Sequence, residues 1–86
     1  MKLELYHRKS CPYSKKVRDF IDQNNLKSKV TFLEVDDIPH STQTLLQLNG
    51  KVTVPCLVIN GEPLLESDEI ISWMDSNLLS ENRMAQ

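Results

Sequence analysis

The chain begins with a short alternation of apolar and charged side chains and then changes to a helical spacing. Residues 2–6 alternate in this way, which predicts a strand. Pro12 favours the start of a helix, because its missing N–H would be unpaired in the first turn. The next apolar side chains recur at intervals of three and four, at Val17, Phe20 and Ile21. We expect this helix to stop at Asn24-Asn25.

Two further strands and a second helix follow. Residues 30–35 are rich in β-branched and aromatic side chains, which is typical of a strand. Pro39 and Ser41 begin a shorter helix, and Gly50 ends it. This helix carries three leucines, Leu45, Leu46 and Leu48. Residues 57–59 predict the third strand.

A hairpin and a third helix complete the pattern. Asn60-Gly61 is a strong two-residue hairpin signal, so we expect a fourth strand over residues 62–65. Ser67 is the expected N-cap of a last helix, with Asp68 and Glu69 in its first turn. The apolar side chains expected to face inward are Ile70, Ile71, Met74 and Leu78.

The order of these elements defines an α/β chain. The first strand, helix and strand require a parallel pair, and the hairpin adds two antiparallel strands. The 86 residues hold one domain at most, which we expect over residues 1–86. With 40% hydrophobic and 26% charged residues, the chain is typical of a globular domain and too short for a two-lobed enzyme. We expect the polar tail from Ser80 to be frayed.

Charge and apolar runs exclude several classes of partner. The net charge is −2, so bulk electrostatics favour neither nucleic acid nor a membrane surface. No apolar run approaches the ~18 residues of a membrane span. The beginning of the chain holds no apolar signal region, and two cysteines are too few for a disulfide-stapled scaffold. We expect a cytoplasmic monomer that binds neither nucleic acid nor membrane.

The basic side chains gather near one of the two cysteines. Residues 1–29 carry eight basic and three acidic side chains, whereas residues 30–86 carry two basic and nine acidic ones. Such a cluster is often only a solvated face. Beside a thiol it also adds positive potential, and the basic residues flanking Cys11 are Arg8, Lys9, Lys15 and Lys16.

Cys11 is the candidate nucleophile. If Pro12 is the first helical residue, Cys11 is the N-cap, where a side chain accepts hydrogen bonds from free N–H groups. The helix dipole also favours negative charge at this position. Such surroundings lower a thiol pKa from about 8.5 to between about 3.5 and 7.5. The alternative is that Cys11 is an ordinary small buried residue.

Ser14 stands where a second cysteine would resolve a disulfide formed at Cys11. A side chain at the third helical position reaches back to the N-cap. A serine hydroxyl cannot resolve a disulfide and can only donate a hydrogen bond to the thiolate. The residues therefore predict one-thiol chemistry, in which another molecule supplies the resolving thiol.

Three motifs of the chain resemble those of the glutaredoxins. They are Cys-Pro-Tyr-Ser at residues 11–14, Thr53-Val54-Pro55, and Glu66-Ser67-Asp68 at the start of the last helix. The resemblance covers essentially the whole chain in the right order. It implies a thioredoxin/glutaredoxin fold of order βαβαββα, with a four-stranded mixed sheet flanked by three helices. It also implies glutathione as co-substrate, and a cis Pro55 that faces Cys11.

The same resemblance implies a glutathione site, residue by residue. Cys11 would form the mixed disulfide, and the backbone of Val54 would pair with the glutathione peptide. The γ-glutamyl end is assigned to Ser67 and Asp68. The remaining assignments are Tyr13 over the sulfur, Arg8 at the glycyl carboxylate, and Lys51, near Thr53, as a second carboxylate contact.

Other segments are more similar to the N-terminal domain of glutathione transferases. Leu64-Leu65 replaces the glycine pair of many glutaredoxins, and residues 63–67 and 54–57 resemble the transferase domain. Transferases carry a following all-helical domain, which we expect to be absent because the chain ends at Gln86. These departures leave the subfamily open. They also leave open whether Ser14 is natural or replaces a cysteine.

The remaining chemical residues favour structural roles. Cys56 follows Pro55 at the start of a strand, so we expect it in the core. His7 is a weaker candidate for a base, and Trp73 is expected to pack or to lie half-exposed. The two cysteines and the two histidines, His7 and His40, lack the spacing of a zinc ligand set, so we expect no metal.

The predicted function is a glutathione-dependent thiol–disulfide oxidoreductase of glutaredoxin type. It would reduce protein–glutathione mixed disulfides through Cys11, in redox homeostasis and electron transport, with glutathionylated proteins as partners. Two alternatives stay open. One is a module that binds a glutathione-ligated 2Fe–2S cluster, which Pro12 disfavours, and the other is a glutathione-binding domain without turnover.

Overall fold

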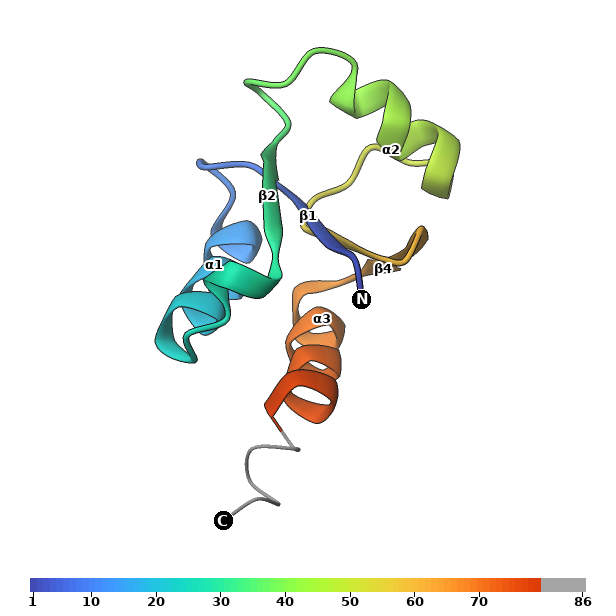
Figure 1. Ribbon diagram of the computed structural model, residues 1–86. Coiled ribbons are helices and arrows are strands. Elements are labelled where there is room, and N and C mark those ends of the chain that lie inside the picture. Colours follow the sequence, from blue (N-terminus) through green and yellow to red (C-terminus); the bar gives the residue numbers. More distant parts are fainter. Residues whose placement is uncertain (80–86) are drawn as a thin grey trace.

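The computed structural model describes residues 1–79, and the expected fraying from Ser80 lies outside this range (Figure 1). The strands are β1 (Leu3–His7), β2 (Thr31–Glu34), β3 (Cys56–Ile59) and β4 (Glu62–Leu65). The helices are α1 (Pro12–Gln23), α2 (Ser41–Asn49) and α3 (Ser67–Met74). A 3₁₀ turn, η1 (Lys27–Lys29), precedes β2, and a π-helical turn, η2 (Asp75–Leu79), continues α3. Each strand and helix that the sequence predicts is therefore present.

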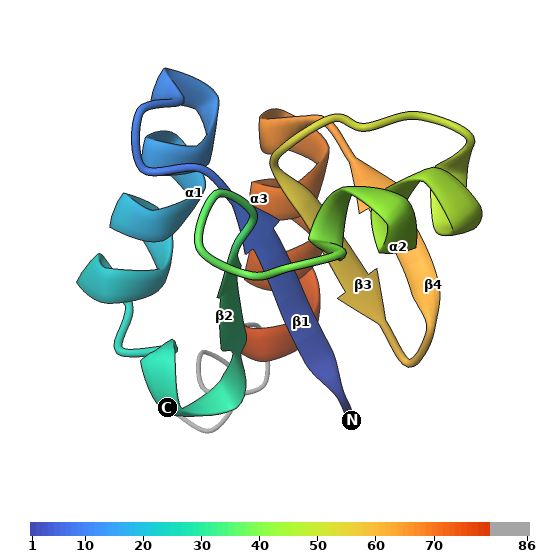
Figure 2. The same ribbon diagram turned by 90° about the horizontal axis from the view of Figure 1, so that it is seen from above.

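The four strands form one mixed sheet in the order β2-β1-β3-β4. β1 and β2 are parallel, whereas β3 is antiparallel to both β1 and β4. Figures 1 and 2 show α1 and α3 on one face of this sheet and α2 on the other. The α/β fold implied by the resemblance, with four strands and three helices, is confirmed.

Two hydrophobic clusters cover the two faces of the sheet. Neighbouring side chains of a strand point to opposite faces, so Leu5 belongs to one cluster and Tyr6 to the other. Cys56 is fully buried in the smaller cluster with Tyr6, which confirms its predicted core position. The larger cluster comprises Leu3, Leu5, Val17, Ile21, Leu26, Val30, Leu57, Ile70, Met74 and Leu78.

The apolar side chains of the helices are buried to different degrees. In α2, Leu45 is fully buried but Leu46 is 52% exposed, because adjacent helical residues are about 100° apart around the axis. In α3, Ile71 is only half-buried beside the buried Ile70. Trp73 is half-buried and packs against the larger cluster, as expected. Among residues 1–79, no helix has the length and apolar character needed to cross a membrane.

The start of α3 corrects one prediction. Ser67 is expected as the N-cap, but it is the first helical residue and Glu66 is the N-cap. The reason is the short connection from β4, because Leu65 still pairs with Cys56 and leaves Glu66 alone to make the turn. Glu66 does so with a φ of 72°, in a region that residues other than glycine seldom adopt.

Candidate active site

The register of the sheet brings the three sequence motifs to one edge. Tyr6 of β1 pairs with Cys56 of β3, and Cys56 pairs with Leu65 of β4. The loop to Cys11 leaves β1 just beyond this row of residues. Val54-Pro55 enters β3 there, through a peptide bond that is cis as the resemblance implied. The turn at Glu66 leaves β4 at the same edge.

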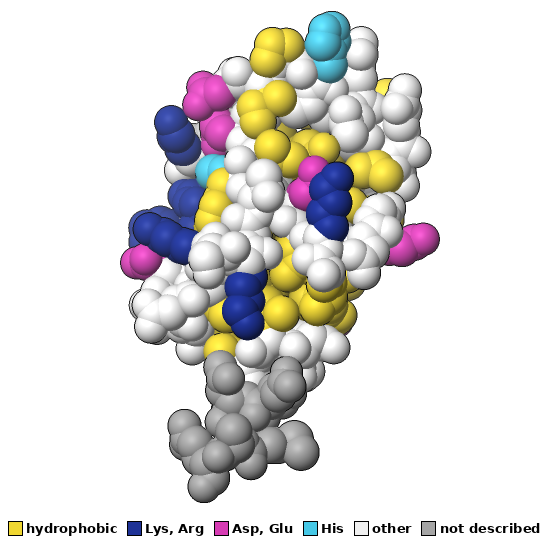
Figure 3. Space-filling view, in the orientation of Figure 1, with side chains coloured by type: hydrophobic (Ala, Val, Ile, Leu, Met, Phe, Trp, Pro, Cys, Tyr) yellow, Lys and Arg dark blue, Asp and Glu magenta, His cyan; other side chains and the backbone are white. Residues whose placement is uncertain are grey.

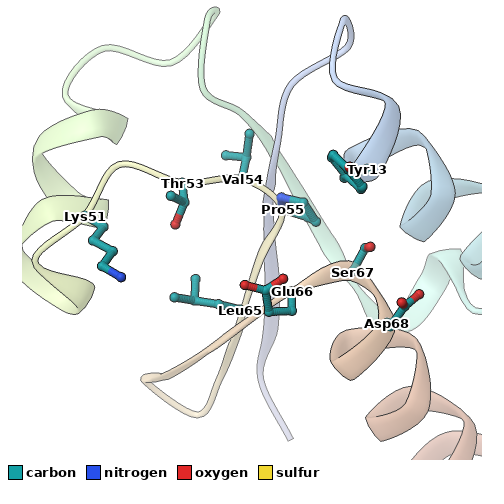
Figure 4. Close-up of a pocket in the computed structure, with 9 residues that line it drawn as sticks. All are labelled: Tyr13, Lys51, Thr53, Val54, Pro55, Leu65, Glu66, Ser67 and Asp68. Atoms are coloured by element: carbon teal, nitrogen blue, oxygen red, sulfur yellow. The ribbon is translucent and has the colours of Figure 1, made fainter.

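A pocket of about 350 Å³ lies between these connections (Figure 4). Seven of the residues assigned by the resemblance line it: Tyr13, Lys51, Thr53, Val54, Pro55, Ser67 and Asp68. Leu65 and Glu66 also line it, although the sequence predicts a role in the site for neither. Glu66 belongs to the Glu66-Ser67-Asp68 motif. Its position next to Ser67 and Asp68 is the signal in the sequence that could have indicated a place in the site. Arg8, Cys11 and Ser14 are not among the lining residues.

Charges of both signs face the pocket. Lys51 comes from the connection between α2 and β3, and Glu66 comes from the turn before α3. Figure 4 shows Lys51 at one side of the pocket and Glu66 near its middle, between Leu65 and Ser67. The pocket therefore suits a ligand that carries both positive and negative groups.

Ser67 and Asp68 lie at the other side of the pocket, at the start of α3. Ser67 is buried, and Figure 4 shows its hydroxyl directed towards Pro55 and Tyr13. Asp68 is 80% exposed at its side chain and forms an ion pair with Lys16 of α1. The Asp68 carboxylate therefore also links α3 to α1.

Cys11 occupies the N-cap of α1, as the sequence predicts. Its backbone is extended, at φ −86° and ψ 120°, and Pro12 is the first helical residue. The Sγ atom is 4.0 Å from the carbonyl oxygen of Val54, to which the thiol donates. Since Val54 lines the pocket, the thiol stands at the edge of the pocket.

The surroundings of Cys11 lower its pKa. Burial acts in the opposite direction and raises the pKa, but it is outweighed by the N–H and hydroxyl of Ser14, the N–H of Tyr13 and the charge of Arg8. The thiol form makes no capping hydrogen bond of its own. The thiolate, in contrast, gains from these first-turn donors, which is the effect expected at a helix N-terminus.

Ser14 is fully buried beneath the thiol. Its Oγ accepts a hydrogen bond of 3.2 Å from the backbone N–H of Arg8. The hydroxyl proton stays available for the Cys11 sulfur, and this contact is one of those that lower the Cys11 pKa. Ser14 thus takes the position relative to Cys11 that the helical spacing predicts.

The four basic residues that flank Cys11, here called the basic collar, are Arg8, Lys9, Lys15 and Lys16. Acidic partners largely neutralise their charge. Arg8 Nε donates to Asp36 Oδ1 at 3.1 Å, and this side chain does not reach the pocket. Lys9 pairs with Asp37 and Lys15 pairs with Asp19. Figure 3 shows basic and acidic side chains next to one another along this side of the molecule. Of the four collar residues, only Arg8 contributes to the lowered pKa of Cys11.

His7 lies at the end of β1 and makes its contacts away from the thiol. Its Nδ1 is 3.1 Å from Arg18 Nη1 and 3.5 Å from Glu34 Oε2. These neighbours give no support to a role as the base for Cys11. Within residues 1–79 there is also no group of three or more His, Cys, Asp or Glu side chains that could hold a metal ion.

The family follows from a comparison of the sequence. The model for "Glutathione S-transferase, N-terminal domain" matches residues 5–78. The chain belongs to this family. The likeness to the transferase N-terminal domain seen in residues 63–67 and 54–57 is therefore confirmed. No curated protein sequence matches this transferase-type domain.

Solved structures of two kinds share the fold of this transferase-type domain. A diazinon-metabolizing glutathione S-transferase of the silkworm Bombyx mori is 22% identical, with a TM-score of 0.75 over 94% of this chain and 40% of its own. A glutathione transferase family member from Pseudomonas fluorescens, with bound glutathione, is 26% identical, with a TM-score of 0.75 over 87% of this chain and 38% of its own. A buckwheat glutaredoxin in complex with glutathione is 24% identical, with a TM-score of 0.68 over 92% of this chain and 73% of its own.

The chain thus spans about two fifths of the length of the transferases that it matches. It spans about three quarters of the buckwheat glutaredoxin. The thioredoxin-like fold is shared by both kinds of protein, and a glutaredoxin from Chlamydomonas reinhardtii gives a similar match, with a TM-score of 0.69.

Proposed function

We propose that this domain is a glutathione-dependent thiol–disulfide oxidoreductase that works through a mixed disulfide at Cys11. The observation that carries the proposal is the position of the Cys11 thiol, 4.0 Å from the Val54 carbonyl at the edge of a pocket with charges of both signs. The lowered pKa of Cys11 supports it, because the thiolate is the attacking form.

The groups of the pocket are complementary to those of glutathione. This tripeptide carries an ammonium group, two carboxylates and a thiol. Glu66 and Asp68 offer negative charge to the ammonium group, and the free N–H groups at the start of α3 suit the α-carboxylate. Lys51 offers its charge to the glycyl carboxylate, and the Val54 backbone offers pairing to the peptide. Arg8 is left out of this proposal because it pairs with Asp36 outside the pocket.

The reaction proceeds by two thiol–disulfide exchanges. The Cys11 thiolate attacks the glutathione sulfur of a protein–glutathione disulfide, and the protein sulfur leaves as a thiolate that takes up a proton. A second glutathione, as its thiolate, then attacks the glutathione sulfur bound to Cys11. This step releases oxidised glutathione and restores the Cys11 thiolate. Ser14 cannot supply the second sulfur, which is why an external thiol is required.

The substrates that follow from this chemistry are glutathionylated proteins. We further propose a cytoplasmic location, where glutathione is abundant and thiols stay reduced, and action as a monomer. A role in redox homeostasis and electron transport would follow from the same exchange reactions.

Reaction with oxidised glutathione tests the site. We expect intact mass and peptide mapping to show one glutathione adduct, on Cys11, and none in the Cys11→Ser variant. The Cys56→Ala variant is the control and should react as the unmodified chain does, because Cys56 is buried on the other face of the sheet. A dominant adduct on Cys56 would refute the assignment.

Turnover of a glutathionylated model protein tests the activity separately. We expect release of its thiol to depend on Cys11 and on added glutathione. If the adduct forms on Cys11 but no substrate is turned over, the domain binds glutathione without catalysis, and the oxidoreductase proposal is wrong.

A further inference from the structure

A polar cluster outside the pocket lies beneath the loop that leads to Cys11. It consists of His7 at the end of β1, Glu34 at the end of β2 and Arg18 in α1. His7 and Glu34 are buried and are direct neighbours in the parallel ladder. Arg18 is half-buried, two helical turns after Cys11. The proposed reaction uses none of these three side chains.

The Arg18 guanidinium holds the backbone of the loop. Its Nη1 donates to the carbonyl oxygen of Arg8 at 3.1 Å, and its Nη2 donates to that of Lys9 at 3.3 Å. The Arg8 carbonyl also accepts the N–H of Cys11 at 3.0 Å. One carbonyl oxygen therefore joins Arg18 directly to the backbone of the nucleophile.

His7 fixes the other side of the guanidinium. Arginine is always charged and can only donate, so His7 Nδ1, 3.1 Å from Nη1, must be the acceptor. The ring is then neutral and carries its proton on Nε2. Burial, with the charges of Arg18 and Lys9, lowers the His7 pKa and outweighs Glu34, which raises it. The neutral ring is thus favoured by burial, Arg18 and Lys9 together, against the opposing charge of Glu34.

We propose that Arg18 is a positioning residue for the thiol site, which holds the loop of residues 8–10 so that Arg8, Ser14 and Cys11 keep their mutual geometry. Arg8 is the connecting residue, since its N–H binds Ser14 Oγ and its carbonyl binds both Arg18 and the Cys11 N–H. Arg18 acts through this backbone, because its guanidinium donates to the carbonyl oxygens of Arg8 and Lys9.

The inference deepens the proposed function and rests on it only in taking Cys11 as the reacting group. Its test needs no glutathione. The measurement is the rate of Cys11 alkylation by iodoacetamide as a function of pH, with peptide mapping to separate Cys11 from Cys56. A failure to form a glutathione adduct would therefore leave this result interpretable.

Two substitutions at Arg18 and one control separate the effect of the planar guanidinium, which bridges two carbonyl oxygens, from the effect of its charge. Arg18→Met removes both, whereas Arg18→Lys keeps the charge but lacks the planar fork that bridges two carbonyls. We expect both variants to shift the alkylation profile to higher pH and to slow Cys11 alkylation at pH 7 by roughly threefold to tenfold, the size of one lost hydrogen bond of ordinary strength. The control, Lys15→Met, removes a charge closer to Cys11 from the exposed face of α1 and should leave the profile unchanged.

Three results would overturn the proposal. The first is a lower melting temperature in both Arg18 variants with an unchanged alkylation profile, which would make Arg18 merely structural. The second is full rescue by Arg18→Lys, which would assign the effect to charge alone. The third comes from the unmodified chain, where ¹⁵N NMR at pH 7 should show His7 protonated on Nε2 only; a proton on Nδ1 would exclude the bond to Arg18.

Discussion

Ser14 connects the nucleophile to the loop in front of it. The spacing of the motif predicts a hydroxyl close to the Cys11 sulfur, and the structure adds a second contact, from the Arg8 N–H to Ser14 Oγ. The hydroxyl therefore serves two groups at once, since it accepts from the backbone and donates to the sulfur. This second contact could not be predicted, because it depends on how the loop of residues 8–10 turns back over α1.

The Ser14→Ala variant should separate these two contributions. We expect the Cys11 pKa to rise, because the hydroxyl is one of the groups that lower it. We also expect a loss of about 0.5–1.5 kcal/mol in the free energy of unfolding, because the Arg8 N–H loses its partner. Alkylation rates against pH measure the first effect, and urea unfolding measures the second. Ser10→Ala, at an exposed loop position, is the control, and an equal change there would contradict the assignment.

At the scale of elements, the Lys16–Asp68 ion pair joins α1 to α3 across the edge of the pocket. Because Glu66 is the N-cap, Asp68 is not needed to cap α3, which removes the structural role that the sequence suggested for this region. Its exposed pair with Lys16 is of the kind that contributes little to stability. The proposed function gives this carboxylate a further role, in binding the ammonium group of glutathione.

Asp68→Ala is therefore expected to affect binding more than folding. The free energy of unfolding should fall by only about 0.2–1 kcal/mol, the range for an exposed pair. The KM for glutathione should rise, while the alkylation profile of Cys11 stays unchanged. Glu69→Ala is the matched control, because Glu69 is the next acid of the same helical turn and does not line the pocket. An unchanged KM in Asp68→Ala would remove Asp68 from the site.

Local signals explain which element boundaries could be predicted. Pro12 and Asn60-Gly61 impose their own backbone geometry, so α1 and the hairpin begin where the sequence indicates. The start of α3 could not be predicted in this way. Glu66 adopts a positive φ because the ladder between β3 and β4 continues to Leu65. The residues around Ser67 do not indicate where the pairing between the two strands ends.

At the scale of the whole molecule, the buried His7 makes folding sensitive to acid. Its folded-state pKa is lowered, so the neutral ring is favoured in the native state and protonation favours the unfolded state. The stability linked to His7 is therefore complete above the unfolded pKa of about 6.5 and is lost as the pH falls below it. We expect the urea concentration at the unfolding midpoint to be lower at pH 5.5 than at pH 7.5.

A comparison of the two histidines isolates this contribution. His7→Asn should reduce the difference between the two urea midpoints, whereas His40→Asn should leave it as it is, because His40 is exposed. Equal pH dependence in His7→Asn and the unmodified chain would show that other groups cause the loss.

The basic collar around Cys11 has acidic partners that could not be predicted from the sequence. Its basic side chains are evident near Cys11, but two of their partners, Asp36 and Asp37, come from the segment after β2. Only the folded chain shows that these charges are compensated. The site residues of Thr53-Val54-Pro55 and Glu66-Ser67-Asp68 could be placed together because a family resemblance supplied their relationship, whereas no such guide existed for Arg18.

The Asn60-Gly61 turn lies at the far end of the sheet from Cys11, yet its length determines the register of the strands that lead to the pocket. Its two residues set the pairing of Ile59 with Glu62, and from there the pairing of Cys56 with Leu65. One extra residue in this turn would move β4 by one position and exchange its two faces. Glu66 and Ser67, which follow β4 directly, would then be displaced from the pocket that they line with Val54. The shape of the pocket therefore depends on the number of residues in a turn that lies outside the pocket.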